Sequence, residues 1–71
     1  MAIYTLTLQA VDGSETTMSL SSESLGPQVA GGHRMTGAEI KAATDAGGPG
    51  SIRVRMFDND AGLPVLSVVE V

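Results

Sequence analysis

The chain has 71 residues and a net charge of −4, from eight acidic and four basic side chains. It lacks cysteine and tryptophan and has one histidine, which excludes disulfides and thiolate zinc sites. The acidic excess opposes binding to a nucleic-acid backbone or to an anionic membrane surface. A domain this small buries only about 60% of its unfolded surface. We therefore expect one domain that gains stability by association with itself or another protein.

The sequence carries no sign of a membrane segment or a secretory signal. It contains no run of about 18 apolar residues, and no basic segment followed by an apolar one opens the chain. We expect the protein to reside in the cytoplasm or within an assembled particle.

Two strands with a tight turn are predicted at the start of the chain. Residues 3–10 alternate, with Tyr4, Leu6 and Leu8 on one face, and residues 15–20 alternate again. Between them, Asp12-Gly13 is a strong turn signal because both residue types tolerate a positive φ. The two segments therefore predict a β-hairpin.

The next segment, residues 21–34, shows no sustained period and is predicted as a long loop. Gly26-Pro27 and Gly31-Gly32 interrupt it. Long loops without secondary structure are uncommon in compact domains. Either this loop makes functional contacts or it contains an edge element, and both interpretations stay open.

A helix is predicted over residues 37–46. Thr36 and Glu39 have the spacing of a capping box, in which each side chain bonds the backbone N–H of the other residue. Gly47 and Gly48 fit a left-handed helix end, and Pro49 prevents continuation. The inner face of this helix, Ile40, Ala43 and Ala46, is small.

Two further strands are predicted at residues 51–57 and 64–71. The last one is apolar on both faces, which is typical of a central strand. The segment Asp58-Asn59-Asp60-Ala61-Gly62 between them is predicted as a turn, because its spacing does not match a calcium loop.

Together these elements predict an α+β domain with the order ββαββ. The expected sheet is four-stranded and mixed, in the order 2-1-4-3, with one helix packed on one face. This outline resembles the β-grasp fold. The alternative is a plain four-stranded α+β sandwich with another strand order.

The face of the sheet opposite the helix is the first candidate binding surface, because no predicted element covers it. Arginine and aromatic residues are enriched at interface hot spots. The candidate residues on this face are Arg53, Arg55, Phe57, Leu66, Val68, Thr5 and Thr7. Further contacts are expected from Leu25, Val29, His33 and Arg34 of the predicted loop.

The leading hypothesis is a non-enzymatic interaction protein, a small structural or accessory subunit such as those of phage or virus particles. Its partner would be another protein or a second copy, with no cofactor, metal or small-molecule substrate. One alternative is an inhibitor that mimics nucleic-acid charge through Asp12, Glu15, Glu23, Asp58 and Asp60. Another is an enzyme that uses His33 with a serine of the predicted loop.

Overall fold

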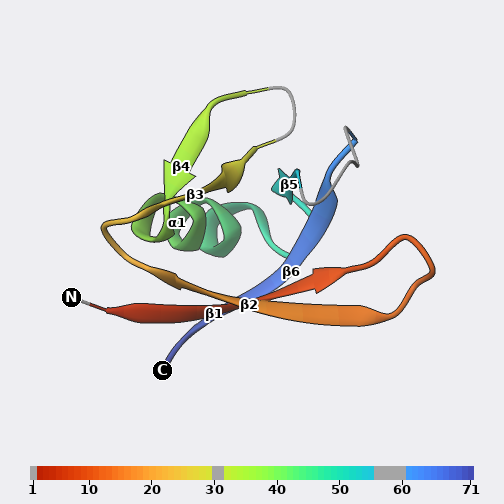
Figure 1. Ribbon diagram of the computed structural model, residues 1–71, viewed down its shortest axis with the longest axis horizontal. Helices are drawn as coiled ribbons and strands as arrows, with labels where there is room; N and C mark the ends of the chain where they lie inside the picture. Colours follow the sequence, from red (N-terminus) through yellow and green to blue (C-terminus); the bar gives the residue numbers. More distant parts are fainter. Residues whose placement is uncertain (1, 30–31, 56–60) are drawn as a thin grey trace.

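The computed structural model of the chain describes residues 2–29, 32–55 and 61–71. Four strands form one antiparallel sheet in the order β2-β1-β6-β5, and β3 and β4 form a separate two-stranded sheet. Figure 1 shows α1 and the β3–β4 hairpin on the same side of the strands β1, β2 and β6. The elements in chain order are β1 (Ile3–Gln9), β2 (Glu15–Ser21), β3 (Leu25–Gln28), β4 (Arg34–Thr36), α1 (Gly37–Gly47), β5 (Arg53–Val54) and β6 (Leu63–Glu70).

The predicted order ββαββ is wrong, because two strands lie where a loop over residues 21–34 was expected. β3 has four residues, two of which are Gly26 and Pro27, and β4 has only three, so neither shows the alternation that marks a strand. The Arg34 guanidinium also links them, donating to the carbonyl oxygens of Gly26 at 2.9 Å and Leu25 at 3.3 Å. Of the two interpretations left open for residues 21–34, the one that expected an additional element in this segment is correct.

The prediction of a mixed, β-grasp-like sheet is also wrong, because β6 runs antiparallel to β1. The position of α1 explains this direction. The helix begins beside the end of β2, where the Ala38 N–H donates to the Ser22 carbonyl. The chain after it meets β6 at Val65, whose carbonyl accepts the Gly50 N–H and which lies opposite Leu8 near the end of β1. β5 therefore starts beside the end of β1 and runs outward from it, and β6 must return toward the start of β1.

A β-bulge in β6 changes which of its residues face the core. Leu8 lies opposite Val65, whereas the preceding Thr7 lies opposite Ser67, so Leu66 is an additional residue. Val65 and Val68 are both buried although they are three positions apart, a spacing that a regular strand would place on opposite faces. The expectation that Val68 lies on the open face is therefore wrong, because its side chain is only 7% exposed.

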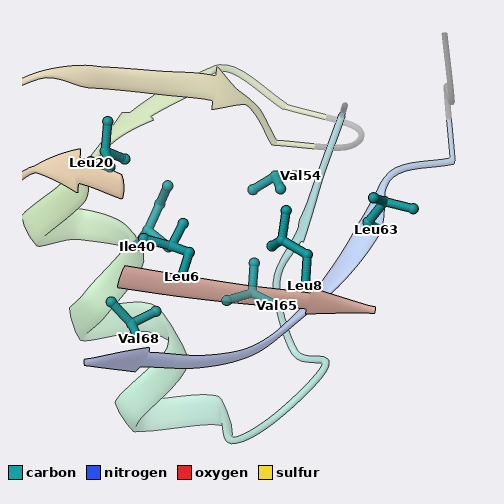
Figure 2. Close-up of a cluster of buried hydrophobic side chains, with 8 residues drawn as sticks. All are labelled: Leu6, Leu8, Leu20, Ile40, Val54, Leu63, Val65 and Val68. Atoms are coloured by element: carbon teal, nitrogen blue, oxygen red, sulfur yellow. The ribbon is translucent and has the colours of Figure 1, made fainter. Parts of the chain in front are cut away.

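The hydrophobic core lies between the sheet, α1 and the hairpin, as Figure 2 shows. Each buried aliphatic side chain stabilises the fold by about 1.5–3 kcal/mol relative to exposure. The helix contributes one large core residue, Ile40, and its capping box is confirmed. The core residues are Leu6, Leu8, Leu20, Ile40, Val54, Leu63, Val65 and Val68.

The other element bounds differ from the predicted ones in small ways. The helix ends at Gly47 rather than residue 46, and its buried inner face is Gly37, Ile40 and Thr44. The strand expected over residues 51–57 is described only as Arg53–Val54, and its residues 56 and 57 lie outside the described part of the chain.

Gly37 is required because its backbone lies directly against β2. A Cβ atom at this position would collide with the Ser21 carbonyl oxygen and lie 2.9 Å from the Ser21 carbonyl carbon. Both obstacles are backbone atoms, so neither can rotate away.

We predict that Gly37→Ala lowers the free energy of unfolding by about 1–3 kcal/mol, despite the better helix propensity of alanine. Gly32→Ala is the matched control, because its nearest neighbour would be 3.8 Å away. That variant should stay within about 0.5 kcal/mol of the wild type. Urea titration measures both, and equal stability of the two variants would contradict the close contact.

Thr44 carries a buried hydroxyl on the inner face of α1. Its residue is 6% exposed, and within the described residues its Oγ1 atom has no hydrogen-bond partner. A desolvated hydroxyl without a partner opposes folding.

We predict that Thr44→Val raises the free energy of unfolding by about 1 kcal/mol, because valine has the same shape without the hydroxyl. Thr44→Ser keeps the hydroxyl and removes the methyl group, so it should lower stability. The thermal midpoints of the two variants test this, and a drop in both would show that the hydroxyl is satisfied.

Candidate protein-interaction surface

The side of the sheet opposite α1 is left uncovered by the described elements (Figure 1). We call this surface the open face. Its side chains alternate with the buried Leu6, Leu8 and Leu20, and the strand register places Thr5 between Ser19 and Val69, and Thr7 between Thr17 and Ser67. Its residues are Ile3, Thr5, Thr7, Gln9, Glu15, Thr17, Ser19, Ser21, Ser67 and Val69.

The open face is nearly free of charge. Glu15, at the first position of β2, is the one charged side chain among these positions, and exposed Arg53 of β5 adds one positive charge at the edge of the face. Most of the other side chains are threonine or serine. Thr5 and Thr7, two of the predicted binding residues, therefore lie in the middle of a neutral, hydroxyl-rich surface.

One end of the open face is apolar and exposed. The exposed fractions are 40% for Ile3, 59% for Val69 and 84% for Val71. The Val71 N–H donates to the Ile3 carbonyl oxygen at 2.8 Å, which places these two residues opposite each other at the ends of the chain. We call Ile3, Val69 and Val71 the terminal patch. Sequence analysis missed Val69 in this surface because the bulge in β6 reverses its face.

The predicted arginines form contacts within the molecule. Arg53 donates from Nε to the Ala61 carbonyl and from Nη2 to the Gly62 carbonyl, each at 3.0 Å. Arg55 donates from Nη1 to the side-chain oxygen of Gln28 at 2.8 Å. Both arginines therefore connect β5 to neighbouring segments.

Two other predicted members of the first surface are not brought into it. Leu66 is half-buried in the bulge, and Phe57 lies outside the described residues. Val68 is buried as well. The predicted residues that lie on the open face are therefore Thr5, Thr7 and exposed Arg53, which alternates with the buried Val54 of β5.

The four loop residues proposed for binding divide into two pairs. Val29 packs against the core and pairs with Val54, and Arg34 is bonded to β3. Leu25 is 54% exposed, and His33 is exposed with its carbonyl oxygen bonded by the Val29 N–H. Val29 and Arg34 stabilise the hairpin, and Leu25, His33 and Arg34 are all exposed.

The described acidic residues are dispersed. Asp12 accepts hydrogen bonds from the Ser14 hydroxyl at 2.6 Å and the Ser14 N–H at 2.9 Å, which lower its pKa and fix the β1–β2 turn. Glu15 begins β2, whereas Glu23 lies beyond its other end. Asp58 and Asp60 lie outside the described residues. The described acidic residues Asp12, Glu15 and Glu23 therefore do not form a dense acidic surface.

Two serines of the segment predicted as a loop, Ser21 and Ser24, are hydrogen-bonded to each other. The Ser21 hydroxyl donates to the Ser24 hydroxyl at 3.0 Å and accepts from the backbone N–H groups of Glu23 and Ser24. Within the described residues, no group of three His, Asp or Glu side chains could hold a metal ion. A shallow pocket of about 440 Å³ beside Gln9 and Pro64 has Arg53 as its one charged lining residue.

No family model, curated protein or solved structure matches this chain. In the ranges that the structure describes, no helix has the length and apolar character required to cross a membrane.

The capping box makes stability depend on pH. The Thr36 N–H donates to the Glu39 carboxylate at 2.9 Å and the Thr36 hydroxyl donates to it at 3.1 Å. These bonds, with a smaller contribution from the charge of His33, hold the pKa of Glu39 below its usual value. A depressed pKa means that the folded state favours the ionised form. The resulting stabilisation is present above the unfolded-state pKa and is lost as the pH falls through the folded-state value.

We predict that stability falls from about pH 5 to pH 3 and that Glu39→Gln makes this fall shallower, because glutamine caps without titrating. Glu23→Gln removes an exposed charge outside the capping box and should leave the slope closer to that of the wild type. Urea midpoints measured across this pH range test the prediction, and an identical slope in the Glu39 variant would contradict it.

Proposed function

We propose that this chain is a non-enzymatic protein–protein interaction module, a small structural or accessory subunit that docks within a larger assembly, a phage or virus particle being one example. The observation that carries the proposal is the open face with its terminal patch. A sheet face that only meets water is expected to carry charged side chains, whereas the centres of interfaces are depleted in charge.

The chemistry of the open face suits contact with another protein. Hydroxyl groups both donate and accept hydrogen bonds, and their desolvation costs far less than that of charges. The terminal patch adds exposed aliphatic area that a partner can bury. Each buried methylene group contributes about 0.8 kcal/mol to such a contact.

The alternatives have less support. Charge mimicry requires acidic side chains spaced as closely as phosphates. Glu15 begins β2 and Glu23 follows its other end, so these two acids are far apart along the strand. Asp12 is hydrogen-bonded within the β1–β2 turn. Catalysis by His33 requires a serine that the histidine can activate. Among the described residues no hydrogen bond joins its imidazole to a serine, and the Ser21 and Ser24 hydroxyls bond each other.

A photo-crosslinking amino acid placed on the open face tests this function inside the native host. We predict that a crosslinker at Val69 forms discrete protein adducts, because this exposed position is part of the terminal patch. Ala42, exposed on α1, is the matched control position. Denaturing electrophoresis and mass spectrometry identify the adducts.

Adducts that form at Val69 and are absent at Ala42 support an interface on the open face. Equal adducts at the two positions, or none at Val69 in a folded and expressed protein, would contradict the proposed function. The assay detects a different protein and a second copy equally well.

A further inference from the structure

β2 is the end strand of the four-stranded sheet, and one side of it is unpaired within the described part of the chain. Hydrogen bonds from Ser22 to Ala2 and from Ala10 to Ser14 flank the β1–β2 ladder. In an antiparallel pair the peptide groups of alternate residues point toward the partner strand. Since Ser14 and Ser22 bond to β1, Glu15, Thr17 and Ser19 direct their N–H and C=O groups outward.

This outward edge has a defined end. The Ser21 carbonyl accepts the Ser24 N–H at 3.3 Å, and the Gly37 backbone lies directly against it. The peptide groups available for pairing are therefore those of Glu15, Thr17 and Ser19. We call these three positions the free edge.

The other described edges are short or partly paired. β5 meets the hairpin through the Val29–Val54 bridge and through the Arg55 N–H, which donates to the Gln28 carbonyl at 2.7 Å. The chain after β4 continues directly into α1, and Pro27 removes a donor from β3. β2 contains no lysine, proline or bulge, and its one charged side chain, Glu15, lies at its first position, so the edge is weakly protected against pairing.

We propose that the free edge pairs antiparallel with the free edge of a second copy, with the two-fold axis at Thr17. The inference rests on the proposed interaction function and names a second copy of the chain as the partner. Thr17 then lies opposite Thr17 of the second copy, and Glu15 lies opposite its Ser19. The two sheets become one continuous eight-stranded sheet.

Three features favour a second copy as the occupant. The free edge is symmetric about Thr17, so it can pair with the same three positions of a second copy. Roughly six hydrogen bonds then satisfy all the outward N–H and C=O groups of the two edges. The two Glu15 side chains lie at opposite ends of the joint and do not face each other. Half-buried Met18, on the core side of β2, lies beside Thr16 of the second copy and is shielded from water.

The association should strengthen with salt. Each copy carries a net charge of −4, and the joint contains no ion pair, so screening removes repulsion without weakening an attraction.

The purified full chain tests the proposal by light scattering and by amide hydrogen exchange at low and high protein concentration. We expect the mass to rise from that of a monomer to that of a dimer. The Thr17 and Ser19 amides should then exchange at least tenfold more slowly. The Thr16 and Met18 amides already point to β1, so they should change little.

A matched pair of variants isolates the outward N–H of Thr17. Thr17→Pro removes this donor and leaves the β1 ladder intact, so it should weaken dimerisation at least tenfold. Thr17→Val keeps the donor and should retain the dimer. Urea midpoints establish whether both variants are folded. If the proline variant does not fold, the exchange of the Thr17 and Ser19 amides in the wild type tests the strand pairing.

A monomer at all concentrations would overturn the strand pairing, and so would a dimer without slowed exchange at Thr17 and Ser19. Neither result affects the crosslinking experiment at Val69, which tests the proposed function independently. Slowed exchange in a dimer, together with absent crosslinks at Val69, would support the pairing and overturn the open face as an interface.

Discussion

The contact between the first turn of α1 and the end of β2 determines much of this structure. Gly37 lies against the Ser21 carbonyl, and the Ala38 N–H bonds the Ser22 carbonyl. This contact starts the helix beside the start of β1, so that the chain after it meets β6 at Val65, near the end of β1, and β5 runs outward. The antiparallel direction of β6 follows. The same contact fills the edge at Ser21 and so limits the unpaired part of β2 to the free edge.

Local signals in the sequence were sufficient for some elements. Asp12-Gly13 marks the β1–β2 turn, and Thr36 with Glu39 marks the helix start, because each motif satisfies its own backbone groups within a few residues. The β3–β4 hairpin has no such signal. Its strands are held by the Arg34 guanidinium and by contact with Val54, which are interactions between distant residues that periodicity does not reveal.

The candidate surface was predictable only where strands are regular. β1 alternates without interruption, so Thr5 and Thr7 were placed on the open face. In β6 the additional residue Leu66 moves Val68 into the core and Val69 to the surface. An apolar strand conceals such a shift, because either register buries aliphatic side chains. Arg53 and Arg55 were assigned to binding because their carbonyl and amide partners in other segments could not be foreseen.

A chain with one helix and one hairpin can cover only one side of its sheet. The core residues bring α1, β3 and β4 to that side, and no described element is left for the other. The composition of the uncovered side fits this constraint, since it is rich in hydroxyl groups and nearly free of charge. The bulge connects the two sides, because the same shift that buries Val68 also exposes Val69 in the terminal patch. Core packing and the interaction surface are therefore set by a single irregularity in β6, and a change that straightened this strand would alter both together.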